Sequence, residues 1–105
     1  MRDQALGDGE PEPHESGIRR VLQIINKKGL HARASAKFVQ TVEKFDAQVT
    51  VTRGAETVGG NSIMGLMMLS AATGTEITVE VSGKQAEDAL AAIVDLVTSG
   101  FGEED

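Results

Sequence analysis

The sequence GLHARAS, at residues 29–35, ends a strand-like run, begins a helix-like run and sets His31 at their junction as a helix-capping residue. The N-terminus of a helix has backbone N–H groups without partners inside the helix, and the helix dipole adds positive partial charge there. Anions bind readily at such an end. No residue from 27 to 37 is acidic, whereas four are basic, namely Lys27, Lys28, Arg33 and Lys37. This stretch therefore predicts a histidine that can carry a phosphoryl group.

The same histidine also has a simpler interpretation. A single histidine after a glycine and a leucine is more often a surface or capping residue than a nucleophile, and a basic cluster can be an ordinary solvated face. A second pattern favours the functional interpretation. It is the sequence GNSIMGLMML, at residues 60–69.

Together the two stretches resemble the HPr phosphocarriers of the bacterial phosphoenolpyruvate-dependent phosphotransferase system, and the resemblance covers residues 18–102. The family's active-site pattern, Gly-Leu-His-X-Arg, matches residues 29–33, and its regulatory pattern, Ser-Ile-Met-Gly, matches residues 62–65. The resemblance implies that His31 becomes a pros-phosphohistidine, phosphorylated on Nδ1. Arg33 then stabilises the phosphoryl group, because a guanidinium suits phosphoryl oxygens. The resemblance further implies a donor, phosphorylated enzyme I, and an acceptor of the EIIA type.

Two stretches look most like the nitrogen-related branch of this family (NPr-like). They are NKKG at residues 26–29 and SGF at residues 99–101, which acidic residues follow. The chain also departs from the sugar-type carriers, in which proline usually stands at the position of Ala34 and basic residues often stand at those of Gln40 and Glu43. An acidic side chain at position 43 weakens docking to an acidic partner, which argues against a role in sugar transport.

The resemblance marks Ser62 as a regulatory phosphorylation site for an HPr kinase/phosphorylase; alternatively, its hydroxyl only caps the helix that follows. That helix is too short to bury all of its Ile, Leu and Met side chains against a sheet. We expect Leu66 and Leu69 inside. The remaining apolar side chains would form an exposed docking patch near His31, consisting of Ile63, Met64 and Met67. Methionine adapts to several partner surfaces.

Composition limits the other functions. A chain of 105 residues has room for one domain, and 40% hydrophobic residues with 3% aromatic ones predict an aliphatic core. With no cysteine and two histidines, we expect no disulfide, no metal site and no cofactor. No apolar run approaches the length of a membrane span or a signal peptide, so we expect a cytoplasmic protein with no membrane partner. Tyr and Trp are absent and no basic stripe is present, which argues against nucleic acid as a partner.

The net charge of −6 resides in the two ends of the chain. Residues 1–17 carry a net charge of −4 and contain both prolines, and the last three residues are all acidic, whereas residues 18–102 carry +1. We therefore predict a disordered acidic tail at 1–17, in which His14 is solvated, an HPr-like domain at 18–102 and an acidic C-terminal tail at 103–105.

Apolar spacing predicts seven elements in the order β-α-β-β-α-β-α. Strands are expected at residues 19–26, 47–53, 55–58 and 77–82, and a helix at 32–44; a short helix begins at Asn61 or Ser62 and ends at Gly74, and a capping box of Ser82 and Gln85 opens the last helix. This order indicates an α+β sandwich with helices on one face of the sheet. The resemblance implies an open-faced sandwich, in which three helices cover one face of a four-stranded antiparallel sheet.

Three hypotheses on function follow. The first is a monomeric phosphoryl carrier, a co-substrate of phosphotransferases rather than a stand-alone enzyme. The second is a regulatory binding module without turnover that acts through Ser62 and the patch around Met64; the presence of both His31 and Arg33 argues against this as the sole role. The third is a small-ligand-binding domain of the ferredoxin-like or ACT type, which would need a polar pocket at a dimer interface that the sequence does not indicate.

Overall fold

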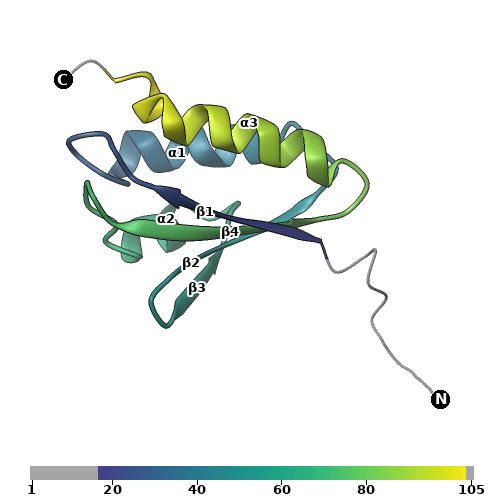
Figure 1. Cartoon of the computed structure of the whole chain (residues 1–105), viewed down its shortest axis with the longest axis horizontal. Coiled ribbons are helices and arrows are strands. Elements are labelled where there is room, and N and C mark those ends of the chain that lie inside the picture. Colours follow the sequence, from purple (N-terminus) through teal and green to yellow (C-terminus); the bar gives the residue numbers. More distant parts are fainter. Residues whose placement is uncertain (1–16, 104–105) are drawn as a thin grey trace.

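The computed structural model describes residues 17–103, and its elements follow the predicted order (Figure 1). They are β1 (Ile18–Gln23), α1 (Ala32–Val42), β2 (Gln48–Arg53), β3 (Glu56–Gly59), α2 (Ile63–Met68), β4 (Glu76–Ser82), α3 (Ala86–Thr98) and the 3-10 turn η2 (Gly100–Gly102). The predictions for residues 1–16, including that for His14, and for residues 104–105 lie outside the described residues. No helix among residues 17–103 is long and apolar enough to cross a membrane.

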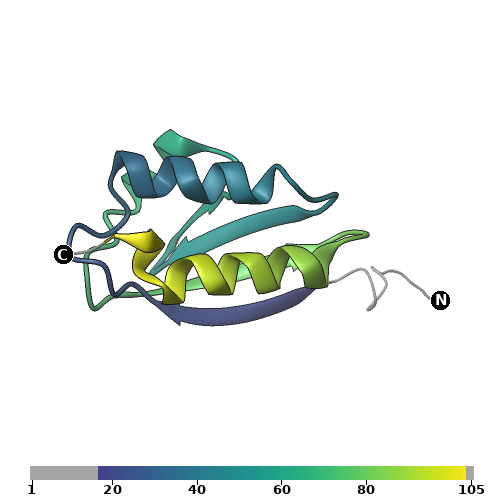
Figure 2. The same cartoon turned by 90° about the horizontal axis from the view of Figure 1, so that it is seen from above.

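The four strands form one antiparallel sheet in the order β1-β4-β2-β3. Helices α1 and α3 run side by side across one face of this sheet (Figures 1 and 2). Helix α2 packs against α1 and against β3. The predicted open-faced α+β sandwich is confirmed.

The core lies between the sheet and the helices and is aliphatic except for two phenylalanines, Phe38 and Phe101. Strand β1 shows why some apolar side chains are buried and others are exposed. Its period of two buries Leu22 and leaves Val21 exposed, and the alternation continues past the strand, where Ile24 is fully buried. In α1 the side chains that recur at helical spacing face the sheet, and they are Ala34, Ser35, Phe38, Val39 and Val42.

The predicted end of the short helix was wrong. Ser62 is the N-cap of α2, where its Oγ accepts a hydrogen bond from the backbone N–H of Gly65 at 2.9 Å, but the helix already ends at Met68. Ser70 has a φ of +52°, a left-handed conformation that stops the helix. Gly74, with a φ of +90°, instead turns the chain into β4, and its N–H donates to the carbonyl of Ile24 at 2.7 Å.

The capping box predicted for α3 was also wrong. The N-cap of α3 is Gln85, and its side chain makes no capping bond. The Oε1 atom of Gln85 instead accepts a hydrogen bond from the backbone N–H of Asp46 at 2.7 Å, across the loop that precedes β2. Glu87 and Asp88 lie in the first turn of α3, where their charge complements the helix dipole.

Candidate functional site

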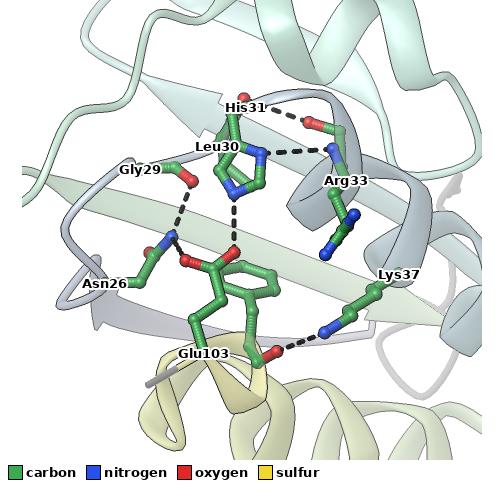
Figure 3. A network of polar contacts seen from close by, with 9 residues as sticks. Asn26, Gly29, Leu30, His31, Arg33, Lys37 and Glu103 are labelled. Carbon is green, nitrogen blue, oxygen red and sulfur yellow. Dashed lines mark hydrogen bonds and ion pairs between the residues drawn. The ribbon is translucent and has the colours of Figure 1, made fainter. Parts of the chain in front are cut away.

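His31 is the N-cap of α1, as its place at the junction of strand and helix predicts. Its backbone is extended, with φ −76° and ψ −176°, and its Nδ1 accepts a hydrogen bond from the backbone N–H of Arg33 at 3.2 Å (Figure 3). Its carbonyl accepts the first bond of the helix, from the N–H of Ser35 at 2.8 Å. The ring nitrogen Nδ1 therefore faces the end of α1 at which free N–H groups and the helix dipole favour negative charge.

The other nitrogen of the ring faces a carboxylate. Nε2 of His31 lies 2.6 Å from Oε2 of Glu103, and the two side chains are 28% and 16% exposed. Because Nδ1 accepts a hydrogen bond, the neutral ring carries its proton on Nε2 and donates it to Glu103. This hydrogen-bond network assigns the tautomer in which Nδ1 carries no proton.

The C-terminal turn brings Glu103 to the histidine. Gly100, Phe101 and Gly102 have φ values of +68°, +58° and +71°, so the chain reverses after α3. The Phe101 side chain is only 1% exposed and anchors the turn in the core. Nζ of Lys37, on α1, donates to the Phe101 carbonyl at 2.7 Å. The turn is thus fixed to both the core and α1.

Asn26 connects Glu103 to the loop that precedes His31. Its Nδ2 donates to Oε1 of Glu103 at 3.1 Å and to the carbonyl of Gly29 at 2.8 Å. These bonds, first that from Asn26 and then that from His31, hold the pKa of Glu103 below its ordinary value of 4.5. The charges of His31 and Lys37 act in the same direction, whereas burial opposes them. Glu103 is therefore ionised at neutral pH.

An open pocket of about 670 Å³ lies beside the imidazole. Its lining consists of Lys28, His31, Ala32, Arg33, Lys37, Gly102 and Glu103. Figure 3 shows Arg33 and Lys37 directed to the same side of the ring. The Arg33 guanidinium forms no ion pair with any residue of the described part of the chain. A pocket with three cationic side chains and the unprotonated nitrogen of an imidazole suits a phosphoryl group.

The predicted docking patch is exposed but lies outside this pocket. Ile63, Met64 and Met67 are 40%, 69% and 39% exposed, whereas Leu66 and Leu69 are buried, as predicted. The patch belongs to α2, which packs against α1. The segment after α2 reaches the histidine loop, since the N–H of Leu30 donates to the carbonyl of Ala71 at 2.9 Å. The patch and His31 are therefore carried by adjoining helices.

Comparison with known proteins gives the site its context. A family model described as "PTS HPr component phosphorylation site" matches residues 18–99. The chain belongs to the HPr family. The phosphocarrier protein HPr of Neisseria meningitidis is 50% identical over 86 residues, which make up 82% of this chain and 97% of the relative. The phosphocarrier protein NPr of Escherichia coli is 40% identical over 88 residues, or 83% of this chain and 98% of the relative.

A solved structure of the HPr family confirms the fold. The crystal structure of HPr-C-His from Thermoanaerobacter tengcongensis superposes with a TM-score of 0.80 at 42% identity, covering 84% of this chain and 99% of that one. The predictions of an HPr-family phosphocarrier and of its α+β sandwich are both confirmed. The chain is therefore a phosphoryl carrier of the phosphotransferase system.

Two residues of the site, Asn26 and Glu103, are not predicted as site residues from the sequence. Asn26 belongs to a stretch that indicates only the branch of the family, and Glu103 begins the predicted acidic tail. The available signal was the single aromatic residue between two glycines, Phe101, since an apolar anchor directly before the acids indicates a turn that packs on the domain.

Proposed function

We propose that this carrier accepts a phosphoryl group on Nδ1 of His31 from phosphorylated enzyme I and donates it to an EIIA-type protein. The observation that carries the proposal is the bond between Nδ1 of His31 and the backbone N–H of Arg33. This bond indicates that the unprotonated ring nitrogen faces the anion-binding end of α1.

The proposed transfer is a nucleophilic displacement at phosphorus. The Nδ1 electron pair attacks, the N–P bond forms, and the bond between phosphorus and the donor's leaving group breaks with its electron pair. Nε2 keeps its proton, so the ring becomes a phosphoimidazolium. Donation reverses these changes, and the N–P electron pair returns to Nδ1. No metal or organic cofactor takes part in the proposed cycle.

The basic side chains of the pocket stabilise the charge that moves during transfer. Arg33 can contact two phosphoryl oxygens with its planar guanidinium, and Lys28 and Lys37 add positive charge at the same pocket. Charge stabilisation and positioning are the main requirements of phosphoryl transfer. We therefore assign Arg33 the contact with the transferred group.

Both partners must reach the same His31, so enzyme I and the EIIA-type protein bind in sequence to a monomeric carrier. The docking patch, consisting of Ile63, Met64 and Met67, suits such alternating partners because flexible apolar side chains repack on different surfaces. Ser62 would regulate docking, because a kinase that phosphorylates it places charge beside the patch. The similarity to Escherichia coli NPr supports the nitrogen-related branch.

The test is incubation of the purified protein with phosphoenolpyruvate and enzyme I. The wild type should gain an acid-labile, alkali-stable phosphate whose ³¹P signal is that of a phosphohistidine, and His31→Ala should gain none. His14→Ala is the matched control and should behave like the wild type. Equal phosphorylation of the His31→Ala protein would exclude the proposed site. A regulatory module without turnover predicts no phosphate on the wild type either.

A further inference from the structure

We infer that Glu103 is a positioning residue that holds the proton on Nε2 of His31 through both halves of the transfer cycle. Only Nδ1 then exchanges the phosphoryl group, and the group stays transferable. This inference rests on the proposed function of His31 and adds a residue that acts through the imidazole.

The first observation is that the Glu103 carboxylate is fixed at both oxygens. Oε2 lies 2.6 Å from Nε2 of His31, and Oε1 accepts a bond from Asn26 at 3.1 Å. Asn26 is itself only 5% exposed and also bonds the carbonyl of Gly29. The carboxylate therefore cannot rotate without breaking one of these contacts (Figure 3).

The second observation is that two locally unfavourable features serve to place this carboxylate. Phe101 is a non-glycine residue in the left-handed conformation, which side chains disfavour. The buried Oδ1 of Asn26 has no hydrogen-bond partner among the described residues. The turn at Phe101 carries Glu103 to the ring, and the amide of Asn26 is oriented so that its N–H₂ group reaches Glu103. Strain and unpaired polar atoms of this kind gather at functional sites.

The third observation concerns charge. Lys28, Arg33 and Lys37 line the pocket beside the imidazole, and each cation disfavours a positive charge on the ring. A phosphoimidazolium carries that charge. Glu103 is the one acidic residue among the described residues of this lining, so it supplies the opposite charge that keeps Nε2 protonated.

The chemistry explains why the proton matters. When the N–P bond breaks in the phosphoimidazolium, its electron pair returns to Nδ1, and the ring leaves as a neutral imidazole with its proton on Nε2. If Nε2 had lost the proton beforehand, the leaving group would be an imidazolate anion, which leaves poorly. A carboxylate that keeps the proton on Nε2 therefore keeps the phosphoryl group ready for transfer, as a buried carboxylate orients the imidazole in hydrolytic triads.

The test has two readouts on three variants. Long-range ¹H–¹⁵N spectra of unphosphorylated protein at pH 8 report the tautomer of His31. The wild type should show the Nε2–H form. Glu103→Ala should show a smaller share of that form, because only the bond from the Arg33 N–H to Nδ1 still favours it. Glu103→Gln should keep the Nε2–H form because its amide oxygen still accepts the bond. Glu56→Ala, an exposed acid on β3, is the matched control and should match the wild type.

The second readout is the rate at which phosphorylated carrier returns its phosphoryl group to dephosphorylated enzyme I. We expect Glu103→Ala to slow this step about tenfold, the equivalent of one charge-assisted hydrogen bond, with the KM for enzyme I changed by less than about twofold. The return rate of Glu103→Gln should lie between those of the wild type and of Glu103→Ala. The deficit of Glu103→Ala should grow from pH 7 to pH 9, since Lys28, Arg33 and Lys37 then act on the ring without an opposing carboxylate.

The outcomes separate this inference from the proposed function. A wild type that takes no phosphate on His31 contradicts the proposed function. Normal phosphorylation of Glu103→Ala with an unchanged tautomer, or with an unchanged rate of return, contradicts only the role of Glu103. If Glu103→Ala were to unfold, Glu103→Gln would still decide, because the inference requires its return rate to fall while its tautomer is kept.

Discussion

His31 and Glu103 are 72 residues apart in the chain, yet Nε2 of one lies 2.6 Å from Oε2 of the other. The imidazole is thus held between a carboxylate on one side and the N-terminus of α1 on the other. The two ring nitrogens have different environments and, we propose, different tasks. One nitrogen keeps its proton, and the other exchanges the phosphoryl group.

Arg33→Ala should fold and bind enzyme I like the wild type but transfer the phosphoryl group about 10²–10³-fold more slowly. This corresponds to a loss of about 2.7–4 kcal/mol, typical of a positioned group on a transition state. The backbone N–H that bonds Nδ1 remains in the variant, so the helix cap is retained. Single-turnover phosphorylation by enzyme I measures the effect. Arg20→Ala, on β1, is the control, and a rate for Arg33→Ala within twofold of the wild type would remove Arg33 from the site.

Substitutions at Ser62 should separate its capping role from its regulatory one. Ser62→Asp keeps an N-cap and should remain folded, but its charge beside Met64 makes docking of an acidic partner harder, raising the KM for enzyme I about fivefold. Ser62→Ala loses the bond to the N–H of Gly65, which should cost about 0.5–2 kcal/mol of stability while transfer stays normal. Thermal unfolding and enzyme I-dependent phosphorylation measure both effects. If Ser62→Asp transfers as fast as the wild type, Ser62 is only a cap.

The stability that Glu103 contributes should depend on pH. Its pKa in the folded protein is lowered from 4.5 by the bonds from Asn26 and His31, so the carboxylate stabilises the fold above about pH 4.5. That contribution is lost as the pH falls through the folded pKa, because the unfolded chain binds the proton more readily. The stabilities of the wild type and of Glu103→Gln in urea unfolding should therefore differ at pH 6, and the difference should shrink as the pH falls below 4.5. A difference that persists or grows on acidification contradicts the pKa shift.

Phe101→Ala should affect both stability and the site. Removing a side chain that is only 1% exposed should cost about 3–5 kcal/mol and free the turn that carries Glu103. Val97→Ala, also fully buried in α3, is the matched control for a loss of packing without a change in the turn. The ¹⁵N shifts of His31 should change in Phe101→Ala but not in Val97→Ala. Equal shifts in the two variants would show that the turn does not position the carboxylate.

The fold was predictable where local patterns dominate. The alternation in β1 and the helical spacing around Phe38 report which side chains face the core, so the element order and the buried residues followed from the sequence. The capping role of His31 was also local, since it depends only on the glycine turn before it and the helix after it.

The features that were predicted wrongly or missed depend mainly on contacts between residues that are far apart in the chain. The Gln85 side chain makes no capping bond in α3 because it accepts a hydrogen bond from the backbone N–H of Asp46, 39 positions away, and no pattern near residue 85 reveals this partner. The short helix ends at Met68, just before Ser70, whose left-handed conformation the sequence does not require of a serine. Glu103 was assigned to a tail because its contacts with Asn26 and His31 span more than 70 positions.

The strand order β1-β4-β2-β3 has a consequence for how the molecule forms during synthesis. Strand β1 has one neighbour in the sheet, β4, and pairs with it from Ile18↔Val81 to Gln23↔Glu76. Strand β1 therefore cannot form its native pairing until β4 has been synthesised. The chain between the two strands is a long loop, and its closure slows the formation of the native pairing. Glu103 is translated later still. Synthesis thus supplies every strand of the sheet before it supplies the carboxylate that faces the imidazole.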